Sequence, residues 1–135
     1  MIGIDTNLLV RFLTRDDPAQ VAAVDRLFAR LSEAAPGFIA REVMVEMVWV
    51  LERAYGFARP DVARAIDALL EARELVIEAA DRVALAAERY RQGGAGFADQ
   101  MILLAGRDAG CEATVTLDAR AARAPEARLL EGGTD

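Results

Sequence analysis

Four acidic side chains have sequence surroundings that point to a shared chemistry. Asp5 and Asp118 each directly follow a short apolar run, while Glu46 and Asp99 interrupt apolar stretches with a helical pattern. If these carboxylates converge, each pair at 4 Å repels by roughly 4 kcal/mol at an effective dielectric near 20. Raised pKa values or bound cations would relieve that repulsion. Oxygen donors without His or Cys suit Mg²⁺ or Mn²⁺, so the acids predict a hard-cation site.

Each acid also has an ordinary structural explanation. Asp5 could cap the following helix, and its residue type fits capping and function about equally. Asp118 also precedes a turn, and capping is the favoured explanation there. For Asp99, an interaction with the helix dipole competes with a functional role. Glu46 is the only polar residue in residues 43–51, so we expect it to be buried, and burying an unpaired carboxylate is costly. For Glu46, a functional role is therefore the favoured explanation.

Missing residue types narrow the available reactions. The chain contains no histidine, and all 16 of its basic residues are arginine. These absences exclude four kinds of site: Ser-His and Cys-His nucleophiles, His-based zinc sites, P-loop lysines and lysine Schiff bases. The net charge of −6 opposes non-specific nucleic-acid binding, unless cations neutralise several acids gathered in one site. Metal-assisted hydrolysis remains among the few hydrolytic mechanisms open to this chain.

Apolar patterns predict strands that alternate with helices over the 135 residues. Such alternation indicates an α/β fold with a mostly parallel sheet, and the length suits a single domain over residues 1–135. Ligand sites in these folds lie at the carboxyl ends of the strands, where Asp5 and Asp118 are expected. Strands are expected at residues 1–4, 37–40, 75–78, 113–117 and 128–130, and helices at residues 7–14, 18–31, 42–55, 61–70, 81–91 and 97–109.

The apolar runs are too short to cross a bilayer, which takes about 20 residues. No basic, apolar leader opens the sequence, so we expect a cytoplasmic protein with no membrane partner. The lone Cys111 allows no disulfide within the chain and no Cys-based zinc site. We expect it to be a small buried residue.

In this order, the acidic motifs resemble those of the PIN domain, and in particular the VapC-type toxin ribonucleases of bacterial toxin–antitoxin pairs. The segment IDTN at residues 4–7 is similar to the first motif, and EMVWVL at 46–51 to the second. The segments GFAD at 96–99 and TLD at 116–118 match the third and last acids. The trailing APEARLL, residues 124–130, is similar to the final strand region. The resemblance covers essentially the whole chain.

The resemblance implies a three-layer sandwich of helices around a central, mostly parallel sheet. It further implies Mg²⁺ or Mn²⁺ in an acidic pocket, endonucleolytic cleavage of RNA, a homodimer and an inhibitory antitoxin partner. By this resemblance, Asp5 and Asp99 would be the principal metal ligands, and Glu46 and Asp118 would complete the pocket. Thr6 and Asn7 would support Asp5 through hydrogen bonds.

The expected reaction is in-line attack of water on a phosphodiester, leaving a 5′-phosphate and a 3′-hydroxyl. Arg120 and Arg123 follow the last acid, where contact with the RNA backbone competes with ordinary solvent exposure. The sequence departs from the family pattern at Gly96, where many relatives carry another acid. That departure weakens a second metal position.

Three alternatives remain open at this stage. A phosphatase-like hydrolase would use Asp5 as a covalent nucleophile, but it would be expected to have a lysine and a second acid just after Asp5. A receiver domain of a response regulator also clusters aspartates and also needs a lysine. A degenerate PIN-like module that binds partners without catalysis would keep the fold; the presence of all four acids argues against it.

Overall fold

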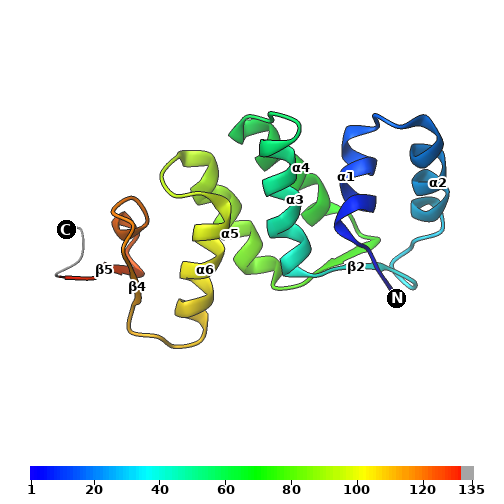
Figure 1. Cartoon of the computed structure of the whole chain (residues 1–135). Helices are drawn as coiled ribbons and strands as arrows, with labels where there is room; N and C mark the ends of the chain where they lie inside the picture. The colour runs from blue at the N-terminus through cyan, green and yellow to red at the C-terminus, as the bar shows by residue number, and fades with distance from the viewer. Residues whose placement is uncertain (132–135) are drawn as a thin grey trace. The chain divides into compact units, whose positions relative to one another are not determined.

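The computed structural model describes residues 1–131, and the chain divides into two compact units, each described by itself. The first unit is Met1–Ala80, and the second begins at Asp81. Figure 1 colours the chain from the N-terminus in blue to the C-terminus in red. All strand pairing in the described residues is parallel.

The first unit holds a three-stranded parallel sheet and four helices. Strand β2 lies in the centre, between β1 and β3. In register, Gly37 of β2 faces Ile2 on one side and Leu75 on the other. The elements are β1 (Ile2–Gly3), α1 (Thr6–Thr14), α2 (Pro18–Ala29), β2 (Gly37–Ile39), α3 (Arg41–Arg53), α4 (Arg59–Glu71) and β3 (Leu75–Ile77).

Local sequence signals account for several of these boundaries. Asp17 caps α2 by accepting a hydrogen bond from the backbone N–H of Gln20, and Pro18 occupies the first turn, where its missing N–H costs nothing. Gly37 opens β2 because a Cβ there would lie 3.1 Å from side-chain atoms of both Ile4 and Leu31. The central strand therefore begins at a residue without a side chain.

The core of the first unit lies between the sheet and its helices. Helix α1 packs beside α3, as Figure 1 shows. Leu9 of α1 and Met44, Met47 and Leu51 of α3 are fully buried there. The spacing of three and four residues in α3 places one stripe of that helix in the core. Its opposite side is open, and Trp49 is 59% exposed, so the expectation of a buried α3 holds for one face only.

The second unit combines two helices with a two-stranded sheet. Strands β4 and β5 pair in parallel, with Val115 opposite Arg128. Tyr90 and Phe97 are fully buried and meet edge to face, with ring centroids 6.2 Å apart. A Cβ at Gly106 would lie 2.4 Å from Thr114 Oγ1, so α6 approaches β4 closely. The elements are α5 (Ala80–Gln92), α6 (Phe97–Asp108), β4 (Thr114–Thr116), the short 3₁₀ helix η1 (Ala121–Arg123) and β5 (Ala127–Leu129).

The predicted alternation of strands and helices is confirmed, as is the parallel α/β class. Every expected element is present, and most boundaries differ by one or two residues. The prediction for Cys111 was wrong, since this thiol is exposed. It follows Gly110, which adopts a positive φ of 87° in the turn after α6, and it lies in the exposed loop between that turn and β4. The assignment of residues 1–135 to a single domain stays a prediction.

Candidate metal and nuclease site

Asp5 lies at the carboxyl end of β1 and forms the N-cap of α1. Its Oδ1 accepts a hydrogen bond of 2.7 Å from the backbone N–H of Thr6, and the residue is exposed. Both explanations offered by the sequence therefore apply, because the cap leaves the residue open to solvent. A carboxylate fixed at the carboxyl edge of a parallel sheet is well placed to meet a ligand.

Glu46 lies in the second turn of α3, the helix that follows directly from β2. The expectation that Glu46 is buried was wrong, because the residue is exposed. The apolar run contains the open face of α3 as well as the buried one, and Glu46 is on the open face. Its Oε1 accepts a hydrogen bond from the Thr6 hydroxyl, and Thr6 itself is only 6% exposed. Thr6 therefore links the two acids, through its amide to Asp5 and through its hydroxyl to Glu46.

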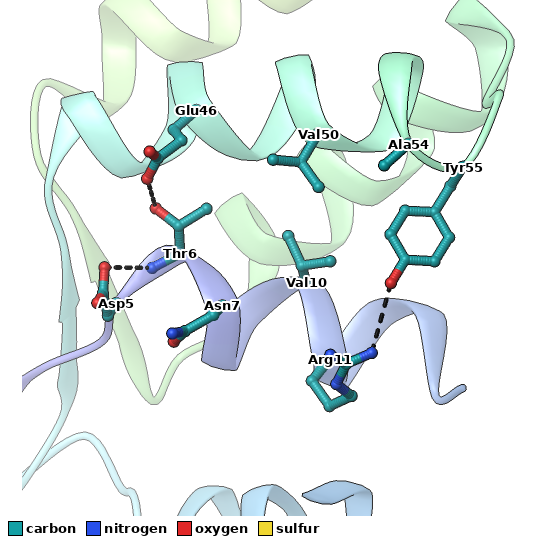
Figure 2. A pocket seen from close by; sticks show the side chains of 9 residues that line it. All are labelled: Asp5, Thr6, Asn7, Val10, Arg11, Glu46, Val50, Ala54 and Tyr55. Carbon is teal, nitrogen blue, oxygen red and sulfur yellow. Dashed lines mark hydrogen bonds between the residues drawn. The ribbon is translucent and has the colours of Figure 1, made fainter. Parts of the chain in front are cut away.

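A cavity of about 500 Å³ opens between α1 and α3, with Asp5, Thr6, Asn7 and Glu46 at one end. Val10, Val50 and Ala54 form its apolar middle, and Figure 2 shows Arg11 and Tyr55 at the far end. The acids are therefore not isolated on the surface, because they line one end of a hollow with walls from two helices.

The far end of this cavity carries its own polar cluster. The Tyr55 hydroxyl donates a hydrogen bond of 2.8 Å to Asp16, and Arg11 forms an ion pair with the same carboxylate. These hydrogen bonds, the one from Tyr55 first, lower the pKa of Asp16 to about 2. Asp16 is thus paired with the guanidinium group of Arg11, whereas the hydrogen bonds to Asp5 and Glu46 come from Thr6.

Glu78 is a further acid that the sequence analysis missed. It follows β3, so it stands at the same carboxyl edge of the sheet as Asp5. Its Oε1 accepts a hydrogen bond of 3.0 Å from the backbone N–H of Arg41, the first residue of α3. A strand-ending acid in residues 75–78 was visible in the sequence. Its bond to a free helix N–H gives it a capping role.

Asp99 lies in the first turn of α6, in the second unit. It is half-buried, and its side chain forms no hydrogen bond or ion pair with any of residues 1–131. The N-cap of α6 is Gly96, and because glycine has no side chain, no side-chain hydrogen bond caps this helix. A Cβ at Gly96 would lie 3.7 Å from Asp99 Oδ2, an ordinary van der Waals distance. The carboxylate is therefore available to a ligand, with room beside it for another acid.

Asp118 follows β4 and serves as a cap, the explanation favoured for it from sequence. Its Oδ1 accepts hydrogen bonds from the backbone N–H groups of Arg120, at 2.8 Å, and Ala121, at 3.4 Å. Its own N–H donates to Thr116 Oγ1 at 3.0 Å. The residue is exposed, so the cap orients a carboxylate that solvent still reaches.

The predicted set of acids is thus divided between the two units: Asp5 and Glu46 in the first, Asp99 and Asp118 in the second. Within residues 1–131, no three His, Cys, Asp or Glu side chains form a group able to hold a metal ion. The pairing of Asp5 and Glu46 through Thr6 is observed, and the convergence of all four acids stays a prediction. Carboxylate, hydroxyl and amide oxygens in one cavity nevertheless fit a hard divalent cation.

Arg120 and Arg123 line a second cavity, of about 270 Å³, which lies wholly within the second unit. The sequence analysis missed two of its other residues, Arg89 and Gln100. The sequence does distinguish Gln100, because it is a polar residue directly before the apolar run of α6. In the structure it is only 5% exposed. A buried amide between Asp99 and that run could have been singled out from sequence.

Parallel strands joined by helices, with oriented carboxylates at the strand ends, define an α/β protein with a candidate acidic site. The PIN domain family matches residues 2–127, and the chain belongs to this family. A VapC ribonuclease of Aquifex aeolicus (strain VF5) is 24% identical over 118 residues, which cover 87% of each chain. Among the described residues, no helix is long and apolar enough to span a membrane.

Proposed function

We propose that this protein is a Mg²⁺- or Mn²⁺-dependent endoribonuclease that acts as the toxin of a toxin–antitoxin pair in the cytoplasm. The observation that carries the proposal is the arrangement of Asp5, Thr6 and Glu46, in which one buried threonine orients two exposed carboxylates at the end of a cavity. The similarity to a VapC ribonuclease supports RNA as the substrate. The family match supports the same chemistry over both units.

Asp5 and Asp99 would be the principal ligands of the cation, and Glu46 and Asp118 would complete its surroundings directly or through waters. Bound there, the ion would supply a Lewis acid that activates water and offsets charge on the phosphodiester. Gly96 leaves a neighbouring position without a carboxylate, which would weaken the binding of a second ion. Histidine and lysine are absent, so the acids bear this role alone.

The residues around the acids set their geometry. The Thr6 amide fixes one oxygen of Asp5, and the Thr6 hydroxyl fixes one oxygen of Glu46, so neither carboxylate must be ordered when a ligand arrives. Asn7 lines the same cavity and offers amide donors to a phosphate oxygen or a water. Such preorganised groups lower the cost of reaching the transition state. The expected products carry a 5′-phosphate and a 3′-hydroxyl.

RNA, a cognate antitoxin and a second copy of the chain are the proposed partners, and one PIN domain over residues 1–135 is the proposed organisation. An antitoxin would have to exclude RNA from the acidic site or withhold its cation. A homodimer would place two such sites in one particle. Both partners are testable by mass measurements on protein purified with and without the product of a neighbouring small gene.

The decisive experiment incubates purified, partner-free protein with a mixed single-stranded RNA pool and Mn²⁺. We expect cleavage that stops with a chelator and in the Asp99→Asn variant. A matched control is Glu71→Gln, an exposed acid at the end of α4, which should cleave as the wild type does. Products ending in a 2′,3′-cyclic phosphate would contradict the proposed mechanism. Mn²⁺ binding that is equal in the wild type and in Asp5→Asn, without any cleavage, would favour the non-catalytic alternative.

A further inference from the structure

The cavity of about 270 Å³ in the second unit is open to solvent and is lined by the end of α5, the first turn of α6 and residues in and around η1. It is smaller than the range of roughly 300–1,000 Å³ that is usual for small-molecule sites. Its polar lining comes from Arg89, Gln92, Gln100, Arg120 and Arg123, and the Gln92 amide already donates to Glu88. A lining of three guanidinium groups and two amides is locally basic, although the net charge of the whole protein is −6.

Gln100 supplies the first argument for a ligand. Its side chain lines the cavity and is only 5% exposed, yet its Oε1 has no hydrogen-bond partner among residues 1–131. A buried acceptor without a donor is destabilising, because the oxygen has lost water and gained nothing in return. Rotating the side-chain amide of Gln100 by 180° would exchange the positions of its oxygen and nitrogen. The group can therefore present either an acceptor or a donor to the cavity.

The arginines supply the second argument. Arg89 is already neutralised, because it makes two hydrogen bonds, of 2.6 and 2.8 Å, to the carboxylate of Glu126. Arg120 and Arg123 form no ion pair within residues 1–131. Two unneutralised guanidinium groups beside a cavity attract an anion, and their planar donors match phosphate oxygens.

The position of the cavity supplies the third argument. Gln100 is the residue after Asp99 in the first turn of α6. Arg120 donates its backbone N–H to Asp118, at 2.8 Å, so both proposed metal ligands of this unit are neighbours of cavity residues. A group bound in the cavity would lie next to the phosphodiester held by those acids.

We propose that this cavity takes one nucleotide of the RNA strand, next to the bond that is cut. Arg120 and Arg123 pair with the phosphate, and the Gln100 amide accepts a hydrogen bond from a base amino group or a ribose 2′-hydroxyl. A nucleotide carries an anion for the arginines and a base or ribose donor for Gln100 within one small unit. The inference rests on the proposed nuclease function and names the part of the protein that selects a nucleotide.

The first test uses nuclear magnetic resonance on the full chain with chelator present, so that neither a metal nor cleavage is required. The probes are the four 5′-nucleoside monophosphates and inorganic phosphate alone. We expect at least one nucleotide to shift the side-chain NH₂ resonances of Gln100 and to bind about tenfold more tightly than phosphate, the gain of one good hydrogen bond in a buried site. Equal binding of phosphate and nucleotides would overturn the assignment of Gln100, and so would resonances that no nucleotide shifts.

The second test measures the binding of short single-stranded RNA by fluorescence anisotropy, again with chelator. We expect the double variant Arg120→Gln/Arg123→Gln to bind at least about tenfold more weakly, with a salt dependence reduced by about one unit for each arginine. Gln100→Met should weaken binding and reduce the preference among nucleotides. The control is Arg128→Gln, the same change of charge at an exposed site on β5 outside the cavity, which should match the wild type.

Two outcomes would overturn the proposal without touching the nuclease assignment. Arginine variants that bind RNA as tightly as Arg128→Gln while Mn²⁺-dependent cleavage persists would show that the cavity takes no nucleotide. Gln100 resonances that respond to a glutamate-rich peptide and not to nucleotides would assign the cavity to a protein partner. Conversely, nucleotide binding by a protein that never cleaves RNA would support the cavity and defeat the nuclease proposal.

Discussion

The two units hold their acids in different ways. In the first unit, Thr6 engages Asp5 through its amide and Glu46 through its hydroxyl, so both carboxylates are oriented by one buried residue. In the second unit, Asp118 is oriented by the backbone N–H groups of Arg120 and Ala121, whereas Asp99 makes no hydrogen bond or ion pair within residues 1–131. The first unit therefore carries a preformed pair, and the second carries one fixed and one open carboxylate.

This difference suggests a division of labour between the units. Oriented groups lower the entropy cost of binding, while an unpaired and half-buried carboxylate gains most from a cation that compensates its charge. The second unit also contains Gln100 and two unneutralised arginines, which are groups suited to binding a substrate. The first unit accordingly provides carboxylates that are already oriented, and the second provides polar groups that still lack a partner.

The largest expected effect comes from neutralising one acid in each unit. Asp5→Asn and Asp99→Asn should each reduce RNA cleavage by two to three orders of magnitude or more, as expected for groups that offset charge in the transition state. Calorimetric titration with Mn²⁺ should show weakened binding in both variants. If only one variant affected Mn²⁺ binding, the proposal that Asp5 and Asp99 both ligate the cation would fail.

The next largest effect should follow from removing the link in the first unit. Thr6→Val keeps the shape of the side chain and deletes the hydroxyl that donates to Glu46. Cleavage should fall about 10–100-fold, the usual cost of losing a partner that orients a metal ligand, with little change in the melting temperature. Thr14→Val, the same change in the last turn of α1, is the control and should cleave normally. Normal activity in Thr6→Val would remove the argument for preorganisation.

Gly96→Asp would sharpen the comparison by adding an acid beside the open carboxylate. Gly96 has an ordinary φ of −68°, and a new Cβ would lie 3.7 Å from Asp99 Oδ2, so the backbone and the Cβ position both accept a side chain. We expect Mn²⁺ to bind about tenfold more tightly, because affinity for a hard cation rises with the number of charged oxygens. Gly96→Asn is the matched control without the charge. Weaker binding in Gly96→Asp would show that Asp99 does not face a cation.

The smallest effect concerns the Arg89–Glu126 ion pair in the second unit. Two hydrogen bonds from Arg89 hold the pKa of Glu126 below its usual range. Because the folded-state pKa is lowered, the pair stabilises the fold above the ordinary value and loses that contribution as the pH falls through the folded value. Glu126→Gln should lower the free energy of unfolding by about 1–2 kcal/mol at pH 7 and by much less at an acidic pH where the folded-state carboxylate is protonated. Urea titrations at both pH values measure this.

The exposed Arg15–Asp25 pair of the first unit is the comparison for that measurement. Both side chains are more than 40% exposed, and pairs of this kind contribute little because water and salt screen them. Asp25→Asn should leave the urea midpoint at pH 7 unchanged. If Asp25→Asn lowered the free energy of unfolding as much as Glu126→Gln does, burial of the Arg89–Glu126 pair would add nothing to its stabilising effect.

Sequence patterns were sufficient for the elements and for several of their ends. Pro18 with Asp17, and Gly110 after α6, mark boundaries through backbone geometry that acts within a few residues. Asp5 and Asp118 could be placed at strand ends for the same reason, because a strand ends where its apolar run ends. The α/β class follows from the alternation of elements, and the family match agrees with it.

Other properties required the folded chain, because they depend on which distant residues meet. Apolar neighbours made Glu46 look buried, yet it lies on the open face of α3 and receives its hydrogen bond from Thr6, 40 positions earlier. Cys111 is exposed although a strand follows it closely. Gln100 gained its unsatisfied oxygen, and Arg120 and Arg123 their shared cavity, only through packing within the second unit. Local pattern thus determined where each element lies, and tertiary packing decided which face of an element is covered and which polar groups are left for a ligand.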